Sequence, residues 1–310
     1  MAYTFKEFTY ASADGKNHIA ACLYTPKDRT VCGVVQIVHG MRDHMGRYHK
    51  MAEILCEQGY AVCGGDHLGH GRTARHSDEL GFFAAEDGAE TVLTDVHKLT
   101  LLMRSQFNGS PIILIGHSMG SLIARMYACS YSRDIDAIVI LGTANNRAAG
   151  LARLLARIVA RRKGDTHRSK MLTQLAFGNY NKKAHQYDPS GQNWLSRDDA
   201  AVAAHTIDPF CSFTFTASAY KDLFDMLARV SSPRFAQEYP KSLPTLIAAG
   251  DMDPVGNYGR APRALAARLS AAGTKDVTLK LYPGARHELF NETNRDEFFR
   301  DLIAWLLERS

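Results

Sequence analysis

The chain has 310 residues, a length that allows one large domain or a core with one substantial insertion. Hydrophobic residues make up 45% and charged residues 22%, which is typical of globular proteins and excludes a disordered or collagen-like chain. The formal net charge of +5 is too small to indicate nucleic-acid binding, so we expect no nucleic-acid partner.

Strand-like and helix-like segments alternate through the first part of the chain. Two strand-like segments flank a turn signal at Asp14-Gly15, which predicts a β-hairpin. Beyond it, apolar runs of strand length alternate with helical spacing, which indicates βαβ units and a mostly parallel sheet. The predicted strands are Tyr3–Tyr10, His18–Tyr24, Gly33–Val38, Tyr60–Cys63, Pro111–Ile115 and Ile135–Leu141, and the predicted helices are Tyr48–Gln58, Gly88–Phe107 and about Ser118–Tyr131.

The alternation stops at Gly142 and resumes near Pro244, with helical spacing but no convincing core strand in between. The elements predicted after the interruption are the strand Pro244–Ala249, the helix Gly259–Ala272, the strand Val277–Leu281 and the helix Thr293–Glu308. We therefore expect an α/β core of residues 1–142 and 241–310, divided by a helical cap of residues 143–240 that is inserted after the sixth core strand.

Neither the cysteines nor the N-terminus indicates an exported protein. The six cysteines include no Cys-x-x-Cys pair, and we interpret them as reduced thiols of a cytoplasmic protein. The N-terminal residues show no basic region followed by an apolar stretch, so no signal peptide is expected. No apolar run approaches the roughly 18 residues that a membrane-spanning helix needs.

A serine nucleophile is predicted in Gly116-His117-Ser118-Met119-Gly120, which fits the G-x-S-x-G pattern. An apolar strand precedes this segment and a helical pattern follows it, as the motif requires. A serine on such a tight turn needs glycines two positions away on either side to avoid clashes. The turn exposes the hydroxyl, and the helix N-terminus offers an N–H group to a developing oxyanion.

The nucleophile needs a base, because a serine hydroxyl is unreactive until its proton is removed. Four histidines follow Ser118, and three of them (His167, His185 and His205) lie in the insertion. His287 alone follows a core strand, in a glycine-containing loop, and we predict that it is the general base.

The carboxylate that orients this base is predicted in Gly250-Asp251-Met252-Asp253-Pro254-Val255, after a core strand. Asp251 and Asp253 are both candidates, and either could instead serve a turn or a helix cap. Asp253 is preferred because it lies deeper in the loop and precedes a proline. The resulting order of serine, aspartate and histidine is that of the α/β-hydrolases.

The oxyanion hole is predicted from two backbone N–H groups. The segment His39-Gly40-Met41 follows the third strand, where the N–H of Met41 would pair with that of Met119. The alternative is that His39-Gly40 only ends the strand in a turn.

Five segments in this order resemble the monoacylglycerol lipase and lysophospholipase branch of the α/β-hydrolases, which is also labelled serine aminopeptidase-like. The resemblance covers residues 4–142 and 243–308, and the segments are His39–Tyr48, Asp66–Thr73, Gly116–Gly120, Gly250–Val255 and His287–Glu292. It implies the α/β-hydrolase fold, a mostly parallel central sheet flanked by helices, with Asp253 as the triad acid and Met41 as the first oxyanion residue. Met41 and Arg42 stand where small residues are common in the family, which would narrow the mouth of the site or favour an anionic group.

The segment Asp66–Thr73 is a weaker candidate for a metal site. Asp66, His67 and His70 lie close together, but nothing nearby completes a ligand set. The family uses this loop as a structural turn, so we expect no metal ion here. His117, beside the nucleophile, is interpreted as a packing residue.

The insertion begins with an amphipathic, strongly basic helix. Between Ala144 and Lys183 there are ten Lys or Arg residues and one acid, Asp165. The preferred interpretation is a cap helix whose apolar face packs on the core and whose basic face is solvated; the alternative is a peripheral contact with an anionic membrane. The apolar residues that share one helical face are Leu151, Leu154, Leu155, Ile158 and Val159.

A second segment of the insertion, Phe210–Tyr220, places three phenylalanines among small residues. Phe210, Phe213 and Phe215 would either line an acyl pocket or pack the cap against the core, and the sequence favours neither interpretation.

Together these residues predict a serine carboxylic-ester hydrolase that needs no metal or organic cofactor. The resemblance implies monoacylglycerols, lysophospholipids or related small acyl esters as substrates. An arylamidase or aminopeptidase would use the same residues, and Asp198-Asp199 is the acidic pair in the insertion that would bind a substrate amine. An acyltransferase and a non-catalytic ligand-binding protein of the same fold also compete with the esterase interpretation.

Overall fold

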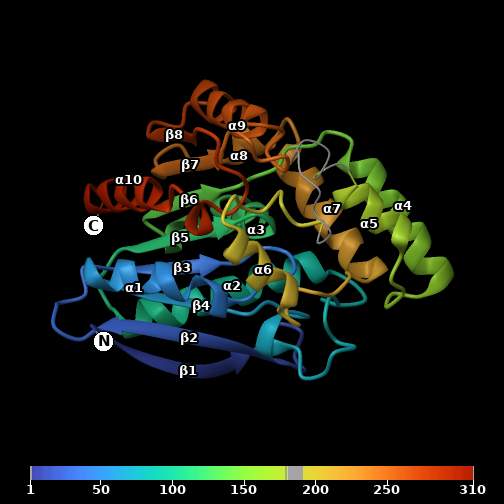
Figure 1. Cartoon of the computed structure of the whole chain (residues 1–310), viewed down its shortest axis with the longest axis horizontal. Coiled ribbons are helices and arrows are strands. Elements are labelled where there is room, and N and C mark those ends of the chain that lie inside the picture. Colours follow the sequence, from blue (N-terminus) through green and yellow to red (C-terminus); the bar gives the residue numbers. More distant parts are fainter. Residues whose placement is uncertain (1, 179, 181–190, 310) are drawn as a thin grey trace.

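An eight-stranded sheet forms the centre of the molecule, in the order β1-β2-β4-β3-β5-β6-β7-β8 (Figure 1). The computed structural model describes residues 2–178, 180 and 191–309. The β1–β2 and β2–β4 pairs are antiparallel, and the other neighbouring pairs are parallel. The strands are β1 Tyr3–Ala11, β2 His18–Pro26, β3 Gly33–Val38, β4 Tyr60–Gly65, β5 Ile112–His117, β6 Ala137–Leu141, β7 Thr245–Gly250 and β8 Val277–Tyr282. The predicted α/β-hydrolase fold class, with its mostly parallel sheet, is confirmed.

Helices cover both faces of this sheet, as the continuous apolar strands require. All residues of β3, β4, β5, β6 and β7 are buried, whereas the edge strand β8 is largely half-buried. One face packs against α1 and α10 and the other against α2, α3 and α9. These helices are α1 His49–Glu57, α2 Gly88–Gln106, α3 Met119–Tyr131, α9 Arg260–Ala271 and α10 Arg295–Leu307.

The carboxyl ends of three parallel strands bring the predicted catalytic segments to one edge of the sheet. β5 ends at His117, immediately before Ser118, and β7 ends at Gly250, three residues before Asp253. β8 ends at Tyr282 and leads into the loop that carries His287. In open α/β sheets ligands bind at this edge, so the architecture places the candidate site where the fold favours it.

Helices connect β6 to β7, and no strand occurs among the described residues of this connection. α7 packs against α2 and α3 of the core, and α4 packs against α7 on the outer side (Figure 1). Within the described part of the chain, no helix has the length and apolar content needed to cross a membrane. The helices are α4 Ala149–Lys163, α5 Lys170–Phe177, α6 Asp199–Ile207, α7 Ala217–Ser231 and α8 Phe235–Glu238.

The preferred expectation for α4, with its leucine face packed on the core, is wrong. The buried residues of α4 are alanines at helical spacing, Ala149, Ala152, Ala156 and Ala160. Their small side chains let α4 approach α7 closely, so the larger apolar residues face outward. The exposed fractions are 63% for Leu151, 51% for Leu154, 38% for Leu155 and 40% for Ile158.

This orientation of α4 predicts effects of different size on the free energy of unfolding for two adjacent substitutions. Ala156→Leu should lower the free energy of unfolding by about 1–3 kcal/mol, because Ala156 is fully buried against α7. Leu155→Ala should change it by no more than about 0.5 kcal/mol, because that side chain is exposed. Urea unfolding of both variants measures the two effects, and the reverse ranking would show that the leucine face is the packed one.

Candidate active site

Ser118 occupies a strained turn that three glycines make room for. Its backbone lies at φ 55° and ψ −118°, between β5 and α3. A Cβ atom on Gly120 would overlap the carbonyl oxygen of Val38, and one on Gly116 would overlap that of Gly120. Gly40 faces the serine so closely that its own Cβ would lie 3.1 Å from Ser118 Cβ. The turn therefore depends on the absence of side chains at these positions.

In the structure His287 contacts Asp253, whereas Asp251 contacts a different part of the same loop. His287 Nδ1 lies 2.9 Å from Asp253 Oδ2, and both side chains are buried. The other carboxylate oxygen of Asp253 accepts the Val255 N–H at 2.8 Å. Asp251 instead accepts the N–H of Gly284 at 2.7 Å and so holds the start of the loop that carries the histidine. The two aspartates thus have separate contacts.

The second ring nitrogen of His287, Nε2, is buried and has no hydrogen-bond partner among the described residues, Ser118 included. His287 and Ser118 line the same cavity. Two tilted aromatic contacts hold the ring, whose centroid lies 4.8 Å from that of His117 and 5.1 Å from that of Trp194. The arrangement suits proton transfer between a serine hydroxyl in the cavity and Nε2.

The two predicted oxyanion donors belong to segments that adjoin Ser118. Gly40 and Met41 line the cavity that also contains Ser118. Met119 follows Ser118 as the first residue of α3, where helix N–H groups have no acceptor within the helix.

The insertion completes the cavity with residues that were not predicted from the sequence. They are Phe177, Gln192, Trp194, Leu195 and His205. His205 is buried, which lowers its pKa to about 4, and the nearby Arg47 charge acts in the same direction. No motif marks these positions, because the resemblance covers the core alone.

Phe210, Phe213 and Phe215, the candidate acyl-pocket residues, are not among the residues that line this cavity. Phe210 packs against His44, with ring centroids 5.5 Å apart. Phe213 and Phe215 both pack against His70 of the core. These aromatic contacts join the insertion to the core.

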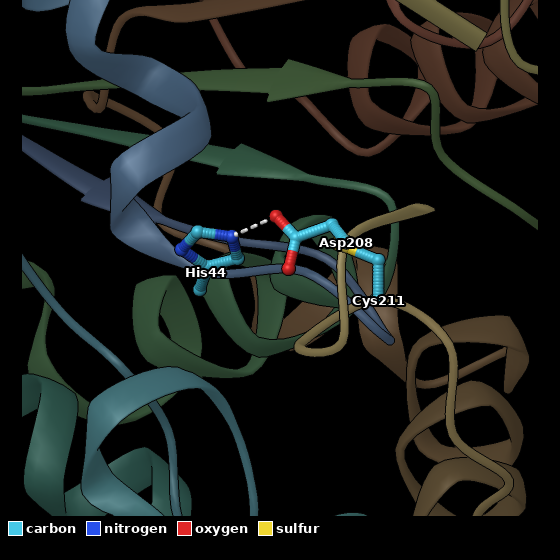
Figure 2. Close-up of side chains that lie close together, drawn as sticks. All are labelled: His44, Asp208 and Cys211. Atoms are coloured by element: carbon cyan, nitrogen blue, oxygen red, sulfur yellow. Dashed lines mark hydrogen bonds and ion pairs between the residues drawn. The ribbon is translucent and has the colours of Figure 1, made fainter. Parts of the chain in front are cut away.

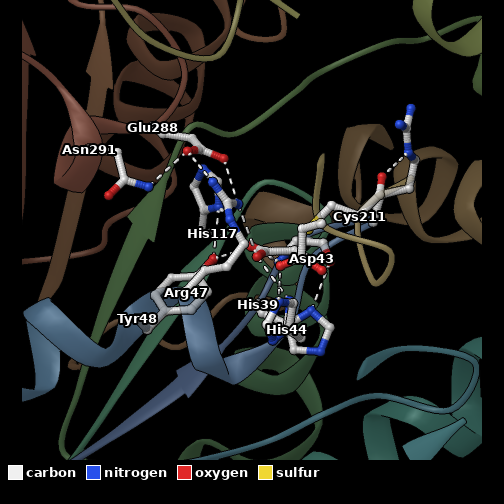
Figure 3. Close-up of polar contacts among 12 residues, drawn as sticks. His39, Asp43, His44, Arg47, Tyr48, His117, Cys211, Glu288 and Asn291 are labelled. Carbon is white, nitrogen blue, oxygen red and sulfur yellow. Dashed lines mark hydrogen bonds and ion pairs between the residues drawn. The ribbon is translucent and has the colours of Figure 1, made fainter. Parts of the chain in front are cut away.

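A buried ion-pair network supports the loops around Ser118 (Figure 3). Arg47 makes two hydrogen bonds to Glu288, of 2.8 and 2.7 Å, and a third of 3.1 Å to Asp43. Asp43 also accepts the hydroxyl of Tyr48 at 2.6 Å and the N–H of Gly40 at 3.3 Å. The network thus connects the oxyanion loop to the residue that follows His287.

Arg47 holds both of these buried carboxyl groups in their charged form. Burial alone would raise the pKa of Glu288, but the charge and hydrogen bonds of Arg47 outweigh it and lower the pKa to about 2. Burial is likewise opposed at Asp43, where Arg47 and His117 keep the pKa well below its usual value.

His44, Asp208 and Cys211 are the one set of potential metal ligands found among the described residues (Figure 2). Their donor atoms lie within 4.8 Å of one another, and His44 Nε2 is 2.9 Å from Asp208 Oδ2. Cys211 is fully buried, and burial raises the pKa of its thiol, which disfavours the thiolate that a metal ion requires. His44 and Asp208 pair with each other, and this contact joins the segment after α6 to the loop after β3.

The Asp66–Thr73 segment forms a turn in which the potential metal-ligating side chains of Asp66 and His70 are hydrogen-bonded to the backbone. Asp66 accepts the N–H groups of Met45 and Arg72, both at 2.8 Å. His70 Nδ1 lies 3.0 Å from the carbonyl oxygen of Leu68, and burial lowers the pKa of this histidine to about 3. These contacts fit a structural turn.

One member of the acidic pair of residues 198 and 199 already has partners. Asp198 is the N-cap of α6, where it accepts the N–H groups of Ala200 and Ala201, and it pairs with Arg295 at 3.1 Å. Neither Asp198 nor Asp199 is among the residues that line the cavity. No contact thus directs this pair toward a substrate amine.

Comparison with known proteins gives a consistent relationship over the whole chain. The family described as "Serine aminopeptidase, S33" matches residues 29–294. The monoacylglycerol lipase of Mycolicibacterium smegmatis is 30% identical, with 99% of each chain covered. The human monoglyceride lipase is 24% identical, with 96% of this chain and 89% of the human protein covered. Among solved structures, a thermostable carboxyl esterase from Bacillus coagulans in complex with glycerol is 31% identical, covers 99% of both chains and has a TM-score of 0.92.

Replacing Arg47 should lower the free energy of unfolding more than replacing an exposed arginine. Arg47→Met leaves Glu288 and Asp43 as buried, uncompensated charges, so the free energy of unfolding should fall by about 3–5 kcal/mol. Arg72→Met removes an exposed pair with Glu7 and should cost about 1 kcal/mol or less.

Urea unfolding at pH 7 measures both effects. Glu288→Gln, added to Arg47→Met, should recover part of the loss because it removes one of the stranded charges. Equal effects of the two arginine substitutions would contradict a supporting role for the network.

Proposed function

This chain belongs to the serine aminopeptidase family of hydrolases, and we propose that it cleaves small acyl esters, such as monoacylglycerols and lysophospholipids, through an acyl-enzyme on Ser118. The observation that carries the proposal is the 2.9 Å contact between His287 and Asp253, which leaves the Nε2 of His287 without a partner among the described residues, in the cavity that contains Ser118. The order and roles of the three residues are those of a serine hydrolase triad.

In the proposed reaction, His287 Nε2 removes the proton of Ser118 as its Oγ attacks the ester carbonyl carbon. Asp253 orients the imidazole and stabilises its charged form. The N–H groups of Met41 and Met119 donate to the oxyanion, and His287 then protonates the departing alcohol. Water attacks the acyl-enzyme with the help of the same histidine, and the carboxylic acid leaves. No step requires a metal ion or an organic cofactor.

The relatives support the substrate class. The Mycolicibacterium smegmatis relative is a monoacylglycerol lipase, and the similar Bacillus coagulans esterase was solved with glycerol. We further propose that residues 143–240 act as a cap that determines which ester reaches Ser118, since Phe177, Trp194 and His205 of this segment line the cavity.

The two neighbouring aspartates provide a matched test of the triad. Ser118→Ala should abolish hydrolysis of 4-nitrophenyl butyrate and of 1-hexanoylglycerol. Asp253→Asn should lower kcat by about 10⁴-fold, because the imidazole loses its orienting carboxylate. Asp251→Asn keeps the contact between Asp253 and His287 and should retain most of the activity.

Steady-state kinetics with both esters, on variants shown by circular dichroism to be folded, measure these effects. Activity that survives Ser118→Ala, or equal losses for the two aspartate variants, would reject the assignment. Product that forms only when a second alcohol is added would identify an acyltransferase instead.

We also propose that the exposed faces of α4 and α5 form a membrane-contact surface, the outer cap face. Its apolar residues are Leu151, Leu154, Leu155, Ile158, Met171 and Leu175, each between 38% and 63% exposed. Four exposed cations near the end of α4 make no ion pair with the described residues: Arg157, Arg161, Arg162 and Lys163. An apolar face beside unpaired basic residues is typical of helices that lie on anionic membranes.

The outer cap face predicts binding to anionic vesicles. Leu154→Ser combined with Ile158→Ser should weaken binding to phosphatidylserine-containing vesicles by at least about tenfold, because two apolar side chains no longer leave water. The matched control is Leu101→Ser with Leu102→Ser, two exposed leucines of α2 that lie outside the insertion. Vesicle sedimentation measures binding, and equal effects of the two pairs would reject this surface.

A further inference from the structure

Two arginines of the loop after β3 line the Ser118 cavity, and their surroundings differ. Arg47 is neutralised by Glu288 and Asp43. The Arg42 side chain donates one hydrogen bond to the described residues, from Nε to the carbonyl oxygen of Cys211 at 2.9 Å. No carboxylate lies within 4.0 Å of the Arg42 guanidinium among residues 2–178, 180 and 191–309. Its charge is therefore not compensated by this part of the chain.

The electrostatic surroundings of Arg42 agree with this. Burial lowers the pKa of Arg42, and among the described residues the groups that oppose burial are Tyr220 and Cys211. The carboxylate of the neighbouring Asp43 accepts hydrogen bonds from Arg47, Tyr48 and the Gly40 N–H. Withdrawing a cation from water without a counter-charge costs free energy. An anionic ligand that bound beside Arg42 would offset this cost.

The backbone holds this arginine in place despite strain. Arg42 has φ 56°, a left-handed conformation that residues other than glycine rarely adopt. The bond from Nε to Cys211 ties the guanidinium to the cap segment. A guanidinium has five N–H donors in a planar fork, so the two terminal nitrogens keep four donors for a planar or tetrahedral anion.

We propose that Arg42 forms an anion-binding subsite of the active-site cavity, which selects esters that carry a carboxylate or a phosphate group in addition to the scissile ester. The proposal rests on the ester-hydrolase function proposed above. Arg42 immediately follows Met41, so an anion on the guanidinium would lie close to an acyl group on Ser118. Paired N–H donors would bind it in the bidentate manner of arginine–carboxylate and arginine–phosphate contacts.

Matched pairs of esters test this subsite and identify where the anion lies. The acyl arm compares 4-nitrophenyl pentanoate with the 4-nitrophenyl monoester of glutaric acid. The head-group arm compares 1-hexanoylglycerol with 1-hexanoylglycerol 3-phosphate. In one arm Arg42→Gln should lower kcat/KM for the anionic member by about tenfold or more, and for the neutral member by less than about threefold. Arg42→Lys keeps the charge but not the planar fork, so its kcat/KM for the anionic ester should lie between those of the wild type and Arg42→Gln.

The matched control is Arg104→Gln, at an exposed arginine of α2, which should match the wild type on every ester.

Equal losses on neutral and anionic esters in both arms would overturn the proposal and assign Arg42 to support of the oxyanion loop. Unchanged rates on every ester would overturn it as well.

A binding measurement separates this proposal from the proposed function. Ser118→Ala protein is titrated with the anionic and the neutral ester of each arm, with tryptophan fluorescence as the signal because Trp194 lines the cavity. In one arm the anionic ester should bind at least about tenfold more tightly than its neutral partner, and adding Arg42→Gln should remove the difference. If the wild type cleaves no ester but this preference is present, the proposed function fails and the subsite stands; if the preference is absent from both arms, the subsite is rejected.

Discussion

The close approach of the β5–α3 turn to the end of β3 is the constraint on which the rest of the site depends. Gly120 lies against the carbonyl oxygen of Val38, and Gly40 lies against Ser118. The loop after β3 and Ser118 can line one cavity because these positions have no side chains. A methyl group at Gly120 would push the helix away from the strand and separate the serine from the Met41 backbone.

Buried ion pairs hold the loops around this turn in fixed positions relative to one another. Two buried acids from distant segments share a single arginine, and the network approaches the imidazole through Glu288, the residue after His287. Such a network is costly to desolvate and costly to break, so it specifies one arrangement of the loops more than it adds net stability. The contrast with Arg42, a few residues earlier on the same loop, shows that the chain neutralises one cavity arginine and leaves the other uncompensated by the described residues.

The core was predictable from the sequence, because strands buried on both faces are continuous apolar runs and their order follows from the βαβ pattern. The segments with Ser118 and Asp253 could be located because each follows such a strand, and the segment with His287 because it follows the half-buried edge strand β8. The orientation of α4 could not be predicted in the same way. Its leucine and alanine faces are both apolar, and the choice between them depends on how closely α7 approaches. The lining residues of the cap, such as Trp194 and His205, carry no local pattern, since only tertiary contacts bring them to the cavity.

The pairing of Arg47 with Glu288 also determines when the site can be completed during synthesis. The two residues are 241 positions apart, and β8 and the His287 loop belong to the last part of the chain. At about 5–20 residues per second, a ribosome needs roughly 10–50 s to pass from one partner to the other. Once Ser118 has been translated, the emerging chain still lacks both His287 and Glu288 until the end of this interval, and Arg47 has only Asp43 as a partner. The proposed triad therefore cannot assemble until the segment that follows β8 has been translated.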